Sequence, residues 1–255
     1  MKTANLRSNK KVLIGSLAIG LLVTFVPPLT LAQSEAPAWL NVRVVQVKTD
    51  RVGEWVELQQ QLAEAMRGVG GPGRIVLQEA RGNPNTFHIV APVAALGRND
   101  DPAAPPLPGP AWENWVSRVV DCIASVQVLT VRDYPELAIP PAQGSEPNLT
   151  MLRFRQIAAG ANDDYYEWLE TNLVPALRDA GVEGYTIGRV YAGGDPGTWV
   201  SGSAINNWAE LDQPGPFANL SEREADRIFG PGAALVRQQE NIVVQYRADL
   251  SVDSD

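Results

Sequence analysis

The sequence has 255 residues, 45% hydrophobic and 20% charged, a globular composition that argues against disordered, collagen-like and coiled-coil proteins. The net charge is −8, but the first 32 residues carry four basic groups and no acid, so the rest carries a net −12. This acidic charge on residues 33–255 argues against nucleic acid and anionic membranes as partners. With one Cys and one His, the chain can form no intrachain disulfide, and we expect no metal site.

The N-terminus has the order of a secretory signal peptide. A basic segment, Met1–Lys11, precedes the apolar to weakly polar run Val12–Val26, and two prolines then break any helix. Leu29–Ala32 places small residues where signal peptidase requires them. We therefore predict a signal peptide over residues 1–32, cleaved after Ala32, and export to the periplasm or the medium. An uncleaved membrane anchor is the alternative, although the apolar run is short for a membrane span.

The first predicted strand covers residues 40–48, where apolar and polar residues alternate. A helix follows, because Trp55, Leu58, Leu62 and Met66 recur at spacings of three and four. The later elements of this half are a strand over 74–82, a turn over 82–87 with a returning strand, an irregular stretch over 92–110, a helix over 111–125 and a strand over 126–132.

The second half of the chain repeats the same order of signals. Residues 149–157 form the counterpart of the first strand, with Arg153 in the place of Arg43. The turn over 194–199 matches the turn over 82–87 almost residue for residue. The other predicted elements are a helix with Asn162 as N-cap, a kink at Pro175 and an end at Gly181, a strand over 185–194, an irregular stretch over 212–220, a helix over 221–239 and a strand over 242–248.

Both halves therefore read β-α-β-β-α-β, the ferredoxin-like order. We assign residues 33–134 to the first repeat, 135–147 to a proline-rich linker and 148–255 to the second repeat. A single repeat leaves one face of its sheet bare. We therefore expect an α+β fold in which the two repeats pack sheet to sheet as an intrachain, pseudo-dimeric α/β barrel.

The strand, the Glu-Trp pairs at 54–55 and 167–168 and the Gly-x-Pro-x-Thr-aromatic turns resemble the dimeric α/β-barrel superfamily, which includes antibiotic-biosynthesis-type monooxygenases. The resemblance covers nearly all of residues 40–249. It implies that relatives with a single unit form the sheet-to-sheet interface by homodimerisation, whereas this chain forms it between its own two repeats. We therefore expect a monomer.

Three arginines are the most informative candidate ligand-binding residues: Arg43, Arg153 and Arg155. If the apolar residues between them face the helices, these side chains point into the barrel interior. A buried guanidinium requires a carboxylate or an anionic ligand. Pairing with an acid such as Glu79, and binding of an organic acid or a polar quinone-like compound, both remain open.

The other candidates are His88, Glu54, Glu167 and Trp199. His88, the only histidine, could carry a proton or ligate haem, or be a half-exposed structural residue; its counterpart is Val200. Glu54 and Glu167 occupy matching places and could act as general bases, but the first turn of a helix favours an acid in any case. Trp199 shares a strand face with Ser201 and Ser203. We expect no bound cofactor.

Two functions are consistent with these residues. The first is a non-catalytic, exported α/β-barrel module that binds a small organic molecule or serves as a scaffold. The second, which the resemblance permits, is a cofactor-independent monooxygenase acting on a small aromatic or polyketide-like substrate held between sheet and helices. The sequence has no hydrolase nucleophile elbow and no nucleotide-binding glycine loop, and we favour the non-catalytic module.

Overall fold

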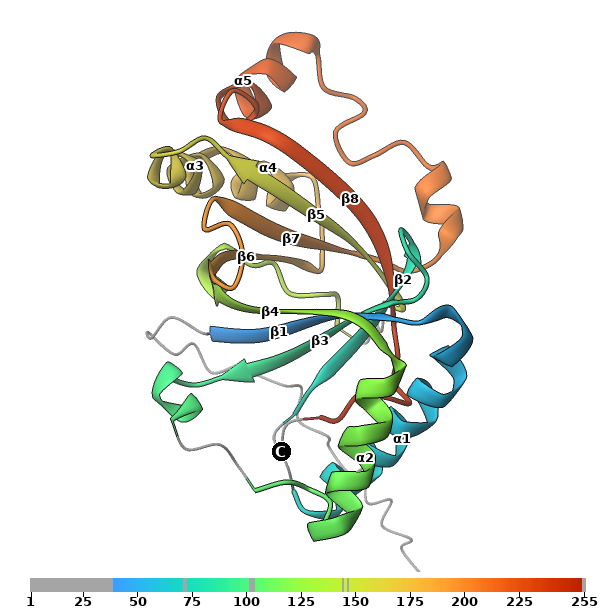
Figure 1. The fold of residues 1–255 in the computed structure, drawn as a ribbon. Helices are drawn as coiled ribbons and strands as arrows, with labels where there is room; N and C mark the ends of the chain where they lie inside the picture. The colour runs from blue at the N-terminus through green and yellow to red at the C-terminus, as the bar shows by residue number, and fades with distance from the viewer. Residues whose placement is uncertain (1–38, 71–72, 101–103, 144, 146, 254–255) are drawn as a thin grey trace, which may run out of the picture. The chain divides into compact units, whose positions relative to one another are not determined.

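A computed structural model describes residues 39–70, 73–100, 104–143, 145 and 147–253; the predicted signal peptide lies outside them. The strands close one antiparallel barrel in the order β1-β3-β2-β8-β5-β7-β6-β4 (Figure 1). The strands are β1 (Trp39–Val47), β2 (Ile75–Arg81), β3 (Thr86–Val93), β4 (Ile123–Asp133), β5 (Leu149–Ile157), β6 (Tyr185–Ala192), β7 (Thr198–Ile205) and β8 (Val236–Tyr246). The helices are α1 (Val52–Gly68), α2 (Gly109–Cys122), α3 (Asn162–Trp168), α4 (Val174–Asp179) and α5 (Glu222–Ala233).

The chain consists of two halves with the same topology, and the predicted pseudo-dimeric α/β barrel is confirmed. The first half (39–133) has the strand order β4-β1-β3-β2, and the second half (149–246) has the order β8-β5-β7-β6. The two sheets are joined along both edges, because β2 pairs with β8 and β4 pairs with β6. Closure leaves no strand at an open edge of either sheet, which is how a barrel avoids the edge-pairing problem.

Each half has its own core between the outer face of its sheet and its helices. In the first half, α1 and α2 lie side by side against the sheet (Figure 1), and the indole Nε1 of Trp115 donates to the carbonyl of Leu58 at 2.8 Å. This core contains Val45, Val47, Trp55, Leu58, Leu62, Val76, Phe87, Trp115, Val119, Cys122 and Leu250. The core of the second half includes Ile157, Tyr165, Trp168, Leu169, Leu173, Val174, Leu177, Tyr185, Ile187 and Trp199.

The segments that follow the last strand of each half are exchanged between the halves. The linker segment (134–143) packs in the core of the second half, where Ile139 forms a β-bridge to Tyr185. The C-terminal extension (247–253) packs in the first half, where Val252 forms the equivalent bridge to Arg74. Leu250 in this extension is completely buried. Each core is therefore completed by residues from the end of the other half.

Several predicted boundaries differ from the structure. The predicted helix over 111–125 ends at Cys122, and the strand predicted to start at Ile242 already starts at Val236. Asn162 is not the N-cap of α3; the cap residue is Ala161, and the Asn162 side chain instead accepts a hydrogen bond from Trp199. The helix predicted around Pro175 is divided in the structure: a π-helical turn, Leu169–Leu173, separates α3 from α4, and Pro175 lies in the first turn of α4.

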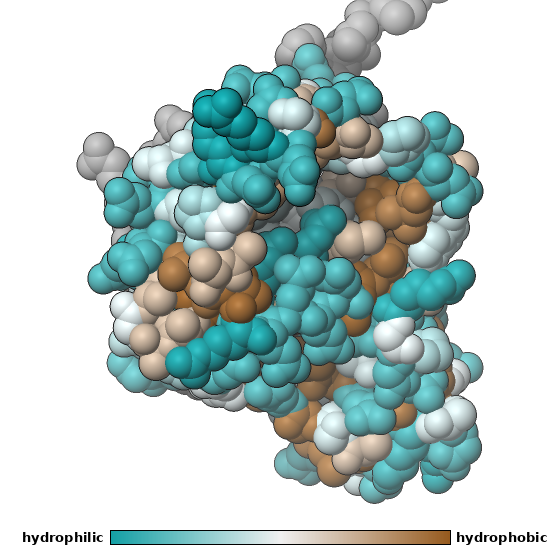
Figure 2. Space-filling view, turned by 90° about the horizontal axis from the view of Figure 1, so that it is seen from above, coloured by the Kyte–Doolittle hydropathy of each residue, from teal (hydrophilic) through white to brown (hydrophobic). Residues whose placement is uncertain are grey.

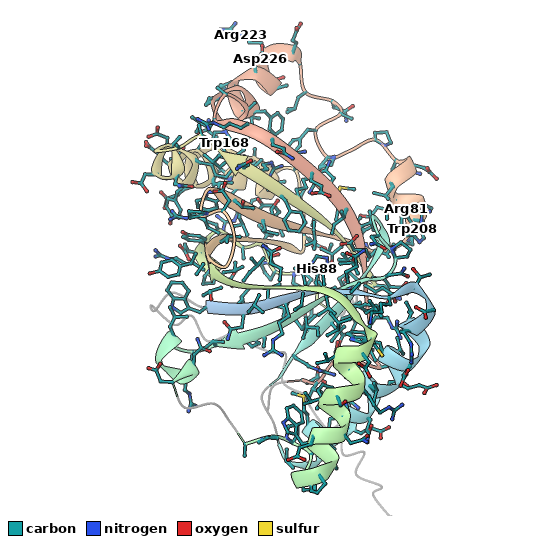
Figure 3. All side chains as sticks on the ribbon, in the orientation of Figure 1. Arg81, His88, Trp168, Trp208, Arg223 and Asp226 are labelled. Carbon is teal, nitrogen blue, oxygen red and sulfur yellow. The ribbon has the colours of Figure 1, made fainter. Side chains whose placement is uncertain are left out.

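Contacts outside the sheet also link the halves. The guanidinium of Arg81, at the end of β2, lies 4.6 Å from the centroid of the Trp208 ring, which follows β7 (Figure 3). Seen from the α5 side, the surface is largely hydrophilic with separate hydrophobic patches (Figure 2). None of the helices in the described part of the chain has the length and hydropathy needed to span a membrane.

Candidate functional site: a cleft in the second half

A cavity of about 750 Å³ lies between the outer face of the second-half sheet and the helices that cover it. The segment after β7 and the C-terminal part of α5 contribute to its walls. The strands supply a largely polar floor of Arg153, Arg155, Tyr185, Ser201 and Ser203, while apolar walls come from Trp168, Leu173, Leu177, Phe217 and Phe229. This combination of an apolar enclosure and a few convergent polar groups is typical of sites for small organic ligands.

The two arginines of the floor donate only to neutral oxygen atoms. Arg153 Nη1 donates to Ser203 Oγ at 2.8 Å, and Arg155 donates through Nε to Gln239 Oε1 at 2.8 Å and through Nη1 to Ser201 Oγ at 3.2 Å. Among the described residues, neither guanidinium forms a salt bridge. Burial, and secondarily the charge of Arg155, lowers the pKa of Arg153.

Two tyrosine hydroxyls are buried beside these arginines. Tyr185, which lines the cleft, is 3% exposed, and Tyr165 from α3 is completely buried. Neither hydroxyl has a partner with good hydrogen-bond geometry within the described structure, although the Ser201 side chain lies close to the Tyr185 hydroxyl and Arg155 lies close to the Tyr165 hydroxyl. Burial raises the pKa of Tyr185 to about 12 and also raises the pKa of Tyr165. Tyr185 is therefore a neutral donor at physiological pH, with an unused hydroxyl at the cleft floor.

The first half shows that the fold does not require this polar floor. Gln46 of β1 pairs with Thr86 of β3, and Gln156 of β5 pairs with Thr198 of β7 in the same way. These two equivalent pairs allow the positions of the two halves to be aligned. In this alignment Val45 and Ile89 occupy the positions of Arg155 and Ser201. Val45 is buried in the first-half core, and Ile89 is partly buried against it. Arg155 and Ser201 are therefore polar in the second half alone, whereas Arg153 has a polar counterpart in Arg43.

The predicted direction of the three arginines is wrong. Alternate residues of β1 and β5 do face opposite sides, but Val42 and Val44 point into the barrel, and the arginines lie on the face toward the helices. Arg43 is exposed there, and only Arg153 and Arg155 line the cleft. The error arises because both faces of a barrel strand can be apolar, so alternation alone does not identify the inner face.

Glu79 pairs with His88 rather than with an arginine. His88 Nε2 lies 3.0 Å from Glu79 Oε1, and the backbone N–H of Asn83 donates to Glu79 Oε2 at 2.6 Å. His88 is buried, not half-exposed: it lies among the barrel strands (Figure 3) and lines a separate cavity of about 420 Å³ together with Phe154. This cavity and the cleft are on opposite faces of the sheet.

The cleft offers no histidine as an axial ligand for a haem. His88 is the only histidine of the chain, and it does not line the cleft. That imidazole faces the barrel interior and is engaged by Glu79. Within the described parts of the chain, no three His, Cys, Asp or Glu side chains cluster as metal ligands would.

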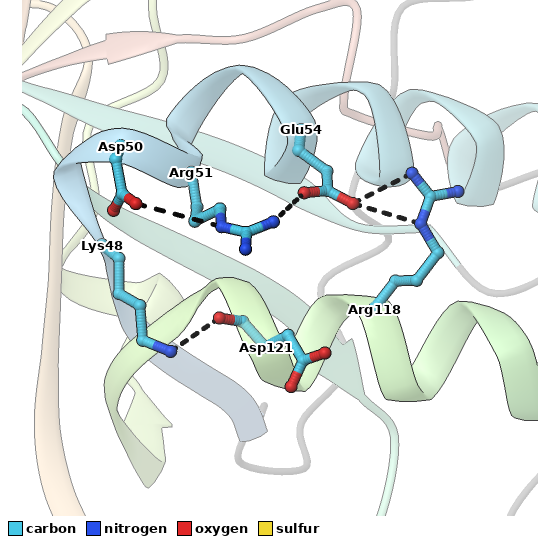
Figure 4. Close-up of polar contacts among 6 residues, drawn as sticks. All are labelled: Lys48, Asp50, Arg51, Glu54, Arg118 and Asp121. Carbon is cyan, nitrogen blue, oxygen red and sulfur yellow. Dashed lines mark hydrogen bonds and ion pairs between the residues drawn. The ribbon is translucent and has the colours of Figure 1, made fainter.

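Glu54 and Glu167 lie outside the cleft. Glu54 accepts from Arg51 Nη1 at 2.8 Å and from Arg118 Nη2 at 3.0 Å, which ties the start of α1 to α2 (Figure 4). Hydrogen bonding by Arg51, followed by that of Arg118, lowers the pKa of Glu54. Glu167 is exposed on α3. The structure therefore does not bring the two carboxylates to a common cavity.

Trp199 belongs to the core adjoining the cleft. Its side chain is 1% exposed, its ring is stacked on Tyr134 with centroids 5.1 Å apart, and its Nε1 donates to Asn162 Oδ1 at 2.9 Å. It therefore fixes the start of β7, from which Ser201 and Ser203 reach the cleft.

Three further cleft residues, Tyr185, Phe217 and Phe229, were not predicted from the sequence. A position-by-position comparison of the two repeats would have exposed the change from apolar to polar floor.

No protein-family model and no curated protein sequence matches this chain. Solved structures that resemble it include an anthrone oxidase-like protein, with a TM-score of 0.58, 10% identity, and coverage of 84% of this chain and 92% of that one. A putative monooxygenase from Lactobacillus acidophilus has a TM-score of 0.57 and 10% identity, with 86% and 97% covered. Chlorite dismutase from Candidatus Nitrospira defluvii has a TM-score of 0.54 and 9% identity, with 85% and 93% covered. These likenesses establish the dimeric α/β-barrel fold, and such a fold hosts many functions.

Proposed function

We propose that this protein is a small-molecule-binding α/β-barrel module whose ligand occupies the cleft of the second half. The observation that carries the proposal is the cleft itself, a volume of about 750 Å³ with aromatic walls over a polar floor. A drug-sized organic molecule fits a cavity of this size. The replacement of first-half core residues by Arg155 and Ser201 supports a role for the floor beyond packing.

Native mass spectrometry of the protein purified from an exporting host tests this function. We expect the single-chain mass plus a reproducible small organic adduct, and we expect Ser203→Trp, a change that fills the cleft from a half-buried position of β7, to remove it. Ala91→Trp, at the half-buried counterpart position of β3, is the matched control. An adduct retained by Ser203→Trp would contradict the cleft as the site. Oxygen uptake with conversion of an added aromatic compound would instead support the monooxygenase alternative.

The export proposal rests on the sequence, and the assembly proposal rests on the closed barrel. We propose that residues 1–32 are removed and that the exported protein is a monomer, because the two halves already satisfy each other's sheet edges. N-terminal sequencing should begin at Gln33, and light scattering should give a single-chain mass. A dimeric mass would contradict the monomer.

A further inference from the structure

We propose that the cleft selects a carboxylate-bearing aromatic ligand, with the carboxylate held by Arg153 and Arg155 and by the hydroxyl of Tyr185. This inference rests on the proposed binding function and adds the chemical class of the ligand. It also names the groups that select it.

The floor of the cleft carries uncompensated positive charge. Arg153 and Arg155 lie on one strand face, and their partners in the described structure are the neutral side chains of Ser203, Gln239 and Ser201. The cleft also has two acids in its lining: Glu210 accepts from the backbone and side-chain nitrogens of Asn206, and Glu183 is exposed. Neither forms an ion pair with the arginines. A carboxylate would supply the missing charge and accept from guanidinium N–H groups in a fork geometry.

The hydroxyl of Tyr185 is an unpaired donor in the same region. A buried hydroxyl without a partner destabilises the folded protein unless a ligand completes its hydrogen bond. The Tyr185 side chain lines the cleft, and its buried hydroxyl is close enough to Arg155 and Arg153 for their charges to affect its pKa, so the three groups lie in the same region. Because it remains protonated at neutral pH, it can donate to an anionic oxygen.

The apolar wall of the cleft distinguishes an aromatic acid from inorganic phosphate. Trp168, Phe217 and Phe229 line the cleft above the polar floor. Inorganic phosphate would satisfy the arginines but leave these rings in contact with water, whereas a planar aromatic body would cover them. The ligand therefore combines an anionic group with an aromatic ring system.

Isothermal titration calorimetry with three probes tests the inference on the full exported chain: 2-naphthoate, its neutral analogue 2-naphthamide, and inorganic phosphate. We expect 2-naphthoate to bind at least about tenfold more tightly than either other probe, given the strength of charge-assisted hydrogen bonds. Arg153→Gln and Arg155→Gln should each weaken 2-naphthoate roughly ten- to hundredfold and leave 2-naphthamide within about twofold. Arg43→Gln, the counterpart position in the first half, is the control and should change neither affinity.

The outcomes of this titration separate the two levels of proposal. Equal affinity for acid and amide would overturn carboxylate selection while supporting the binding function. Phosphate bound as tightly as 2-naphthoate would assign an inorganic anion site and would also overturn the inference. Failure of every probe, together with the absence of a native adduct, would contradict the binding function itself.

Tyr185→Phe gives two further readouts, the melting temperature without ligand and the affinity for 2-naphthoate, and the first does not depend on the probe. Without ligand, we expect an unchanged or higher melting temperature, because the variant removes an unsatisfied buried hydroxyl. With 2-naphthoate, we expect roughly three- to tenfold weaker binding. A melting temperature several degrees below that of the parent protein would show that the hydroxyl has a structural partner, and would overturn its assignment to the ligand.

Discussion

Gly232 of α5 packs directly against the indole ring of Trp168, with no space between them for a methyl group. Trp168 also donates through Nε1 to the carbonyl of Ile228 at 2.7 Å. The same indole lines the cleft. One tryptophan therefore holds α5 in place and forms part of the ligand wall, so the position of α5 and the shape of the cleft are coupled.

Gly232→Ala should destabilise the protein. The added Cβ would overlap the Trp168 ring, and overpacking of this kind costs about 1–3 kcal/mol, partly offset by the better helix propensity of Ala. Gly230→Ala in the same helix is the matched control, because nothing lies within 4 Å of its Cβ position. Urea unfolding monitored by tryptophan fluorescence would measure both. Equal stability of the two variants would contradict the tight fit.

Leu250→Ala should destabilise the first half, because the C-terminal extension places this side chain, which is 0% exposed, in the core beneath α1 and α2. We expect a loss of about 2–5 kcal/mol in the free energy of unfolding. Leu137→Ala should cost a similar amount in the second half, since Leu137 is 2% exposed in the linker segment. Asp253→Ala, at an exposed position, should change little. Native stability of Leu250→Ala would show that the extension is not part of the core.

Glu79→Ala should destabilise the barrel through lost hydrogen bonds. The change would leave both His88 Nε2 and the Asn83 backbone N–H without their acceptor, at a cost of about 1–3 kcal/mol. Glu240→Ala is the control, because it alters the same cavity from an exposed position. Its free energy of unfolding should lie within about 0.5 kcal/mol of that of the parent protein. Chemical denaturation checks both values. If binding of the cleft ligand fell in Glu79→Ala without loss of stability, the two cavities would not be independent.

Glu54→Gln should remove a pH-dependent contribution to stability without affecting ligand binding. The folded-state pKa of Glu54 lies below the ordinary value of 4.5, owing first to its hydrogen bond with Arg51. Its contribution is therefore fully present above about pH 4.5 and is lost as the pH falls through the folded-state value. Melting curves should show the parent protein as the more stable at pH 7, with the difference shrinking by pH 3 and in high salt. A difference that grew toward low pH would contradict the ion pair.

The fold could be predicted because local signals and the repeat agree. The apolar helical stripe that begins at Trp55 and the Asn/Asp-Pro turns occur in the same order in both halves. Each predicted sheet has one face that no helix covers, so packing of the two sheets into a closed barrel follows. The start of β8 was missed for a physical reason. Residues 237–241 are polar and exposed, so they lack the alternation that marks a half-buried strand, and pairing with β5 determines their conformation.

The candidate site was only partly accessible from the sequence. Arg153 and Arg155 stand out as charged residues in an apolar strand, but their side of the sheet depends on closure of the barrel. Tyr185 carries no local signal, because an aromatic residue at the start of a strand is usually core. Its significance arises from the missing hydrogen-bond partner, which only the packed structure reveals.

The exchange of segments after β4 and β8 has a consequence for biosynthesis. Because Leu250 and Val252 complete the first-half core, that half cannot reach its final packing until residues 250–252 have been synthesised and have left the ribosome. A protease cut between Ile139 and Leu149 would leave two fragments that still interlock, each carrying a piece of the other's interior. The architecture thus suits a split-protein complementation pair better than it suits two independently expressed domains.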